Sequence, residues 1–470
     1  MAVQEHLPCF PARALVLPLL LLQVSALDNG LGRVPWMGWS AWEVFRDTTV
    51  EQDAQHSLSE ALIRQTADAL VEGGFAAAGY KIVWIDDAWA SKERDASGKL
   101  VPDPKRWPNG IKPVADYVHS KGLLFGMYGD IGTRTCAGYP GLQRPDGDFS
   151  ADANQLAEWG VDAFKVDGCN ADVAKMDRSY PALGLALNRT GRPILYSCSW
   201  PDYERSESYP INFTLLAQHC NSWRIFWDVQ AGQYAKTPRQ RFDCVNGYLE
   251  FAATGSTEKA AQFSPNCPGD WNPPKQQPVP VNSAEMIAAA GPGSFNDGDM
   301  LPIGVNYTMD GGKISRREAF SPVQARTAMA LWAVLASPLM IGADVRSMEA
   351  DSRSVWLNAG LIAANQDPLG RQGTRIRGNA SACQVWRREL SGNQLLCVIY
   401  NNGGCSTAPA GAANITVTWD ELGLGQGASV DVTELISGSH LGEKVQQITV
   451  ELVDGASAAL RLKPQESVII

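Results

Sequence analysis

The chain has 470 residues, of which 45% are hydrophobic and 19% charged, so it can form a large core and is neither disordered nor fibrous. The length predicts two domains. A formal net charge of −10 and a pI near 5.1 argue against a nucleic acid or an anionic membrane as partner, because both favour a basic surface. Fifteen tryptophans are a high count, and their flat apolar rings either stack on sugars or fill the core.

The first 26 residues have the form of a secretory signal. Arg13 precedes the apolar run 14–22, and Val24-Ser25-Ala26 matches a small-x-small cleavage site. The run is too short to span a bilayer, and no later segment comes close to a membrane span. We therefore expect a soluble mature protein that starts near Leu27.

Glycosylation and cysteine patterns fit secretion. Five Asn-x-Ser/Thr sequons predict glycosylation at Asn188, Asn212, Asn306, Asn379 and Asn414. Loss of Cys9 with the signal removes one of ten cysteines and leaves an odd number, so we expect at least one thiol to be free or buried.

From Pro35 onward, short β-runs alternate with amphipathic helical stretches, which is typical of a parallel α/β fold. The expected strands are 34–42, 81–86, 123–130, 163–167, 194–199, 222–228, a weak one at 286–290, and 335–341. These eight units predict a (β/α)8 TIM barrel, whose chemistry lies at the carboxyl ends of the strands.

Three helices have clear signals between these strands. One carries Ile63, Ala67, Leu70 and Val71 on one face before Gly73-Gly74, the second runs from a Ser150 cap to Gly160, and the third opens at Ser321-Pro322 and runs through Trp332.

The helical periodicity of the sequence ends after Asn365-Gln366-Asp367-Pro368-Leu369-Gly370. Short runs rich in Val, Ile and Thr follow at 383–387, 395–400, 415–419, 429–435, 445–453 and 458–462. They predict an antiparallel β-sandwich. We therefore divide the chain into a signal peptide (1–26), a catalytic barrel (27–372) and a C-terminal sandwich (373–470).

Acidic residues gather at the ends of the predicted barrel strands. They are Asp86, Asp87, Asp130, Asp167 and Asp228, together with the loop Asn296-Asp297-Gly298-Asp299-Met300. Such a cluster repels itself unless a metal, several bases or many hydroxyl donors offset the charge. The histidines after the signal are His56, His119, His219 and His440, and none stands at a strand end in ligand-like spacing. We therefore expect no metal and no cofactor.

Sugar recognition explains the carboxylates better, since each hydroxyl can donate to one and cations such as Lys165 and Arg224 supply complementary donors. Two carboxylates can then cleave a glycosidic bond, one at the anomeric carbon and one protonating the leaving oxygen. Asp167 is the candidate nucleophile, because it ends an apolar β-run just before Gly168. The alternative is an ordinary turn or helix-cap aspartate.

Taken in order, several motifs resemble glycoside hydrolase family 27, which holds the α-galactosidases and α-N-acetylgalactosaminidases. These are Leu27-Asp28-Asn29-Gly30-Leu31, Met37-Gly38-Trp39-Ser40-Ala41-Trp42, Ile85-Asp86-Asp87, Lys165-Val166-Asp167-Gly168-Cys169, Cys198-Ser199-Trp200-Pro201, Trp223-Arg224, Asn296-Asp297-Gly298-Asp299-Met300 and Asn365-Gln366-Asp367-Pro368-Leu369-Gly370.

The resemblance implies a role for each matching residue and a retaining mechanism through a covalent glycosyl-enzyme. Asp167 would be the nucleophile and Asp228 the acid/base. The substrate-binding residues would be Trp42, Asp86, Asp87, Tyr128, Lys165, Ser199, Asp202, Tyr203, Arg224 and Asp299.

The preferred sugar depends on the loop from Ser199 to Tyr203. Animal α-galactosidases of the family carry Glu and Leu where this chain has Ser199 and Asp202, and the N-acetylgalactosaminidases carry Ser and Ala. Ser199 leaves room for an N-acetyl group. Asp202 fits neither pattern and would face an acetyl methyl poorly, so both sugars stay open.

The resemblance also implies disulfides Cys136–Cys169 and Cys198–Cys220, and Cys244 and Cys267 are candidates for a third in a long segment after Asp228. A family disulfide at the early loop is missing, because Ala88 stands in place of one cysteine and residues 47–57 contain none.

The main hypothesis is an exo-glycosidase of the lysosome or the extracellular space that acts on α-galactosides or α-N-acetylgalactosaminides of oligosaccharides, glycolipids or glycoproteins. Its main alternative is a galactose-binding barrel without catalysis, which the presence of both Asp167 and Asp228 disfavours. A phosphosugar enzyme would need a Gly-rich phosphate loop, and residues 339–345 make a poor one. A homodimer remains open.

Overall fold

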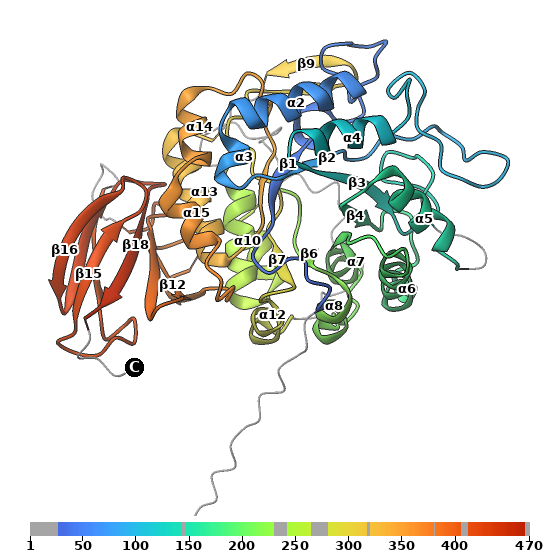
Figure 1. Ribbon diagram of the computed structural model, residues 1–470. Helices are drawn as coiled ribbons and strands as arrows, with labels where there is room; N and C mark the ends of the chain where they lie inside the picture. The colour runs from blue at the N-terminus through green and yellow to red at the C-terminus, as the bar shows by residue number, and fades with distance from the viewer. Residues whose placement is uncertain are drawn as a thin grey trace, which may run out of the picture.

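A computed structural model describes residues 27–142, 147–229, 242–264, 281–316, 320–379, 381–405 and 412–465. Figure 1 shows a barrel surrounded by helices, with a separate β-sheet domain on one side of it. The predicted signal segment and Cys267 lie outside the described residues.

Eight parallel strands form the barrel, as the sequence predicts. They are β1 (Met37–Ser40), β2 (Ile82–Trp84), β3 (Leu124–Asp130), β4 (Ala163–Asp167), β5 (Leu195–Cys198), β6 (Ser222–Arg224), β7 (Phe295–Asp297) and β10 (Leu339–Ile341). The sheet order is β10-β1-β2-β3-β4-β5-β6-β7. A parallel bridge between Leu301 and Ile341 joins the end after β7 to β10 and closes the circle.

Helices and a hairpin surround these strands. The helices are α1 (Trp42–Phe45), α2 (Glu60–Glu72), α3 (Phe75–Ala78), α4 (Lys112–Ser120), α5 (Ser150–Trp159), η1 (Val173–Lys175), α6 (Met176–Arg189), α7 (Trp200–Ser206), α8 (Phe213–His219), α10 (Asp243–Thr254), α11 (Thr257–Gln262), α12 (Ser283–Ala289), α13 (Pro322–Leu335), α14 (Ala350–Trp356) and α15 (Ala359–Asn365). The hairpin is β8 (Tyr307–Asp310) with β9 (Lys313–Arg316).

The prediction of the seventh strand at 286–290 is wrong. Most of that run belongs to α12, which Asn282 caps by accepting hydrogen bonds from the amides of Ala284 and Glu285. The strand is β7, and its sequence, Phe-Asn-Asp, has only one apolar residue. The apolar run therefore marked the helix before the strand.

Two details of the predicted helices differ as well. Val71 is 42% exposed, and the buried face of α2 uses Leu62 and Thr66 beside the predicted Ile63, Ala67 and Leu70. Ser150 is the first residue of α5 rather than its cap. By contrast, α13 begins as predicted, with a capping box in which Ser321 accepts from the amide of Gln324.

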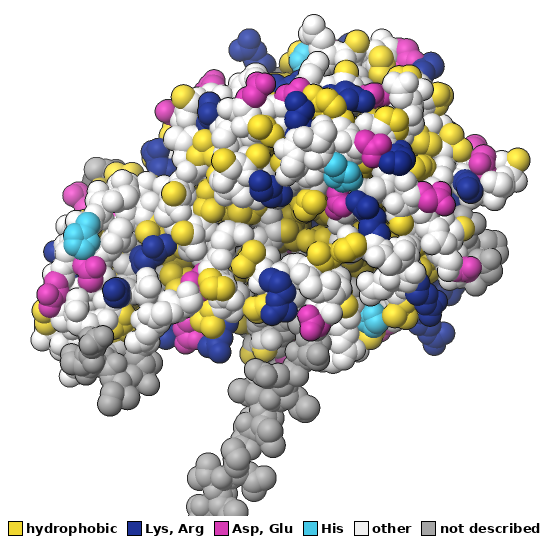
Figure 2. All heavy atoms as spheres, viewed as in Figure 1, with side chains coloured by type: hydrophobic (Ala, Val, Ile, Leu, Met, Phe, Trp, Pro, Cys, Tyr) yellow, Lys and Arg dark blue, Asp and Glu magenta, His cyan; other side chains and the backbone are white. Residues whose placement is uncertain are grey.

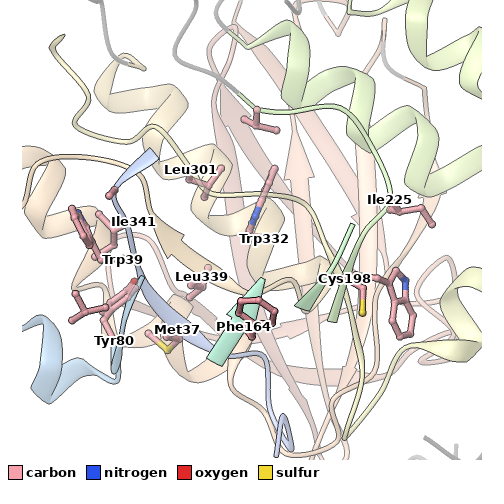
Figure 3. Close-up of a cluster of buried hydrophobic side chains, with 14 of the residues drawn as sticks. Met37, Trp39, Tyr80, Phe164, Cys198, Ile225, Leu301, Trp332, Leu339 and Ile341 are labelled. Carbon is pink, nitrogen blue, oxygen red and sulfur yellow. The ribbon is translucent and has the colours of Figure 1, made fainter. Parts of the chain in front are cut away.

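Side-chain alternation along β4 separates core from site. Phe164 and Val166 are fully buried and pack outward, in the layer between strands and helices. Ala163 packs in the barrel interior with Trp84, and the period of two puts Lys165 and Asp167 on the same inner face, nearer the carboxyl end. Figure 3 shows part of the outer layer, where Trp39 lies beside Ile341.

The C-terminal domain is antiparallel, as predicted. Its strands are β11 (Thr374–Arg377), β12 (Gln384–Leu390), β13 (Gln394–Tyr400), β14 (Ala413–Thr418), β15 (Ser429–Glu434), β16 (Ser439–Val445), β17 (Gln447–Leu452) and β18 (Ser457–Pro464). One sheet has the order β11-β12-β13-β18-β15-β16, and β14 pairs with β17. The sequence did not reveal β11 or β16, and the predicted strand 445–453 is divided at Gln446, whose φ is 69°.

The two domains are packed together through α13, which contacts β12, β13 and β18. Arg388 on β12 is 1% exposed and donates to the carbonyls of Arg371 (2.7 Å) and Ala364 (2.8 Å). Its burial and its hydrogen bonds to barrel-side carbonyls join the sheet firmly to the barrel.

The surface agrees with the acidic composition. On the face shown in Figure 2, basic and acidic side chains are interspersed rather than gathered into one basic area. Over the described ranges, no helix is both long and apolar enough to cross a membrane.

Arg106 holds the early loop in which the sequence lacks the family disulfide. Its guanidinium is 1% exposed and donates from Nη1 to the carbonyls of Thr48 (2.6 Å) and Leu58 (3.0 Å) and from Nη2 to that of Asp47 (2.8 Å). These bonds tie both ends of the loop, residues 47–48 and residue 58, to one side chain.

Replacement of Arg106 with Met should therefore destabilise the fold by roughly 2 to 4 kcal/mol, because two buried carbonyls and one partly buried carbonyl lose their donor. Urea denaturation of the two proteins measures the difference. Arg371→Met is the matched control, since Arg371 is 64% exposed and its ion pair contributes little. Equal unfolding free energies for Arg106→Met and the parent would contradict this role.

Candidate active site

One cavity of about 310 Å³ opens at the carboxyl ends of the barrel strands. All twelve residues predicted for catalysis and sugar binding line it: Trp42, Asp86, Asp87, Tyr128, Lys165, Asp167, Ser199, Asp202, Tyr203, Arg224, Asp228 and Asp299. The barrel brings them together because parallel strands end on one face.

Lys165 and Ser199 surround the carboxylate of Asp167. Lys165 Nζ lies 3.9 Å from Asp167 Oδ2 and 3.1 Å from Asp86 Oδ2. Ser199 Oγ donates a short hydrogen bond to Asp167 Oδ1. Burial lowers the pKa of Lys165, but Asp167 and Asp86 outweigh it, so its pKa lies above the ordinary value and the ammonium stays charged.

Asp86 and Asp87 line the cavity, and each is 2% exposed. Asp86 Oδ1 accepts from the amide of Asp87 (2.9 Å), and Asp87 Oδ2 accepts from the amide of Ala137 (2.8 Å). Burial raises the pKa of Asp86, and it raises that of Asp87 to about 6. Both carboxyl groups therefore accept backbone hydrogen bonds away from solvent.

Arg224 joins two further carboxylates that line the cavity. Its Nη1 lies 2.8 Å from Asp299 Oδ1, and its Nη2 lies 2.9 Å from Asp228 Oδ1. The side chain of Asp228 is 44% exposed, whereas that of Asp299 is 6% exposed. Burial raises the pKa of Asp299 to about 8, although Arg224 opposes the shift. Asp228 is therefore the more solvent-accessible of the two carboxylates.

The backbone of Asp299 is unusual, with a φ of 85° that side-chain-bearing residues seldom adopt. Its amide donates to Asp297 Oδ1 (2.8 Å), and its carbonyl accepts from Trp332 Nε1 (3.1 Å). Its second carboxylate oxygen accepts from the amide of Val229 at 2.8 Å. The strained residue is fixed from three directions.

The first turn of α7 forms another wall. Asp202 forms an ion pair with Arg205, one helical turn further on, so it does not stand alone in the cavity. The hydroxyl of Tyr203 lies 3.2 Å from Cys169 Sγ.

Disulfides fix the loops at the site. Cys136 is bonded to Cys169 and Cys198 to Cys220, the two pairs expected from the sequence. A third pair, Cys383–Cys405, was not expected. Cys397 is the free, buried thiol among the described cysteines. The candidate Cys244–Cys267 bridge cannot be compared because Cys267 lies outside the described residues.

Sequence reasoning missed several site residues. Glu43, Arg46 and Met300 also line the cavity, and so does the predicted disulfide pair Cys136 and Cys169. Glu43 and Arg46 follow the predicted Trp42 by one and four positions, so proximity in sequence was the available signal.

Arg205 and Asp130 support the site and were also missed. The i, i+3 spacing of Asp202 and Arg205 was a readable helical signal. Asp130 is one of the acids at the predicted strand ends, but the sequence assigns it no role. Its Oδ2 accepts from the amide of Cys169 at 2.8 Å, and burial raises its pKa to about 8.

Asp130, Cys136 and Cys169 form the one group of metal-ligand side chains that lie close together in the described part of the chain. The two cysteines are bonded to each other, so neither can offer a thiolate. This group is therefore a disulfide beside a carboxyl group rather than a metal centre.

Two family models match most of the chain. A family model described as "Alpha galactosidase A" matches residues 34–279 and 277–367, and one described as "Alpha galactosidase C-terminal beta sandwich domain" matches residues 380–462. The chain belongs to glycoside hydrolase family 27. It is thus a member of a family of glycosidases, as the motif resemblance indicated.

Named relatives within family 27 fall into two groups. The α-N-acetylgalactosaminidase of Gallus gallus is 39% identical over 415 residues, which cover 88% of each chain. The α-galactosidase A of Homo sapiens is 38% identical over 369 residues, covering 78% of this chain and 74% of the relative. Among solved structures, α-galactosidase I from Mortierella vinacea superposes with a TM-score of 0.70 at 28% identity, covering 93% of this chain and 98% of the other.

Several buried carboxyl groups in this family 27 protein have raised pKa values, so the free energy of unfolding should depend on pH. Burial raises the pKa of Asp130, Asp299 and Glu204 to about 8. Glu204 lies outside the cavity lining and its Oε2 has no hydrogen-bond partner. A carboxyl group with a raised folded pKa contributes stability that is present below its unfolded pKa near 4 and is lost as pH rises through the folded value.

The unfolding free energy should therefore fall between about pH 4 and pH 8. Glu204→Gln should flatten this slope, because a neutral amide has no proton to lose. Thermal melts across this pH range measure both effects. Glu93→Gln is the control, since Glu93 is 77% exposed and should leave the slope unchanged. An unaltered slope in Glu204→Gln would show that the buried carboxyl does not contribute.

Proposed function

We propose that the protein is a retaining exo-glycosidase that removes terminal α-linked galactose or N-acetylgalactosamine. The observation that carries the proposal is that Asp167 and Asp228 line the same cavity, where Lys165 lies near Asp167 and Arg224 pairs with Asp228. Its relatives named α-galactosidase and α-N-acetylgalactosaminidase support it. A galactose-binding barrel without catalysis would not need both carboxylates.

In the first step, Asp167 attacks the anomeric carbon while Asp228 gives its proton to the departing oxygen, which leaves as an alcohol. The hydrogen bond from Ser199 to Oδ1 and the charge of Lys165 near Oδ2 hold the attacking carboxylate in position. Asp228 suits the acid role because its exposure places it where the leaving group meets water.

In the second step, Asp228 removes a proton from water, and the resulting oxygen nucleophile displaces Asp167 from the sugar. Two inversions give net retention. The bound sugar would donate its hydroxyls to Asp86 and Asp87 and pack against Trp42, which is half-buried at the cavity wall.

The group on the second carbon of the sugar would meet Ser199 and Asp202. Ser199 is small enough to leave room for an acetamido group. Asp202, in its ion pair with Arg205, presents a polar surface to that group, which suits a hydroxyl or an amide better than a methyl. Both sugars are therefore proposed substrates, with the galactoside favoured.

We also place the enzyme in the secretory pathway, in the lysosome or outside the cell. The signal-like segment supports this location, as do the disulfides, which form in oxidising compartments. The asparagines of all five sequons are exposed, so each is accessible to glycosylation.

Loss of either catalytic carboxylate tests the mechanism. Asp167→Asn should abolish turnover of 4-nitrophenyl α-galactoside, and Asp228→Asn should lower kcat by about 10²- to 10⁴-fold. Galactose binding, measured by calorimetry, should persist in both. Asp116→Asn is the control, because Asp116 is 56% exposed on α4 and should leave activity unchanged. Full activity in either catalytic variant would refute the assignment.

Sugar preference can be tested at Asp202. Asp202→Ala alone would leave Arg205 buried without its partner, so the substitution should be made with Arg205→Met as well as singly. Against the Arg205→Met background, Asp202→Ala should raise kcat/KM on 4-nitrophenyl α-N-acetylgalactosaminide and not on the α-galactoside. Equal changes on both substrates would show that Asp202 does not contact the second-carbon group.

A further inference from the structure

We propose that Arg205 is a positioning residue for the acid/base carboxyl group, an inference that rests on the proposed function. Arg205 joins α7, which forms one wall of the cavity, to residues 225–228, the segment that follows β6 and ends on Asp228. Arg205 is not among the residues that line the cavity, so it acts through the residues it contacts.

The contacts of Arg205 run in two directions. Toward α7, its Nη2 forms the ion pair with Asp202. Toward the acid/base segment, its Nε donates to the carbonyl of Ile225 at 3.1 Å, and its guanidinium lies over the rings of Phe226 (5.1 Å) and Trp227 (5.4 Å). The side chain therefore contacts each of the three residues that separate Arg224 from Asp228.

The surroundings make this link rigid. The side chain of Arg205 is 1% exposed, and a third ring, that of Phe251 on α10, lies 5.7 Å from it. A guanidinium among aromatic faces gains cation–π attraction that increases as water is excluded. A buried arginine with a carboxylate partner is costly to move, so the segment it contacts stays in one place.

Asp228 needs such support because residues 225–229 form no helix or strand. The carboxylate itself is 44% exposed. Arg224 holds the carboxylate at 2.9 Å, and the amide of Val229 donates to Asp299 at 2.8 Å. Arg205 adds a hold on the backbone and rings between these two points. An acid that moves by about 1 Å protonates the leaving oxygen less well.

The consequence is specific to the leaving group. A good leaving group such as 2,4-dinitrophenolate departs without a proton, whereas methanol does not. Loss of Arg205 should therefore slow the hydrolysis of methyl α-galactoside far more than the hydrolysis of the dinitrophenyl glycoside. A general loss of folded protein would slow both equally.

The test uses Asp202→Asn/Arg205→Met, compared with Asp202→Asn alone, so that no buried carboxylate is left unpaired. The double variant should lose about tenfold or more of kcat/KM on the methyl glycoside relative to the dinitrophenyl glycoside, compared with the single variant. Arg205→Lys in place of Arg205→Met keeps a positive charge at this position, so it should recover part of the lost ratio of kcat/KM values. Arg371→Met is the folding control. An unchanged ratio would overturn the proposal.

Hydrogen–deuterium exchange separates this inference from the proposed function. In the double variant, the amides of residues 225–229 should exchange faster than in Asp202→Asn. If the parent protein hydrolyses neither 4-nitrophenyl α-galactoside nor 4-nitrophenyl α-N-acetylgalactosaminide, the proposed function fails. The exchange result still decides whether Arg205 holds residues 225–229. Unchanged exchange there would overturn the positioning role whatever the activity.

Discussion

The constraint on which the site depends is the burial of several carboxylates beside few cations. Lys165 pairs with Asp86 and lies near Asp167, and Arg224 divides its guanidinium between Asp228 and Asp299. Each cation thus serves one proposed catalytic carboxylate and one buried carboxylate. Burying either cation alone, or either set of carboxylates alone, would be too costly, so the recognition and catalytic groups stabilise each other.

Much of this arrangement could be predicted because the barrel converts local patterns into shared position. The strand ends that carry Asp86, Asp167 and Asp228 were visible as apolar runs followed by acids, and parallel topology then required them to meet. The prediction failed at β7 because a three-residue strand with one apolar side chain has no periodicity to detect. Its neighbour α12 supplied a stronger apolar signal and was mistaken for it.

The contributions that could not be predicted come from contacts between distant residues. The pairing of Asp202 with Arg205 follows helical spacing, but the ring of Phe251 reaches Arg205 from another helix, and no local pattern indicates that. In the same way, Arg106 gathers carbonyls from both ends of a loop more than 45 residues earlier in the chain. An arginine can replace a covalent bridge at such a place because its planar fork donates several hydrogen bonds at once.

The raised pKa values also bear on how a sugar is recognised. A carboxyl group such as Asp87, with a pKa of about 6, changes between acceptor and donor within the pH range of secretory and lysosomal compartments. A sugar hydroxyl can both donate and accept, so its contact with Asp87 survives the change, whereas an ammonium or a metal ion would lose its partner. The contact between a sugar hydroxyl and such a carboxyl group therefore does not depend on one fixed protonation state.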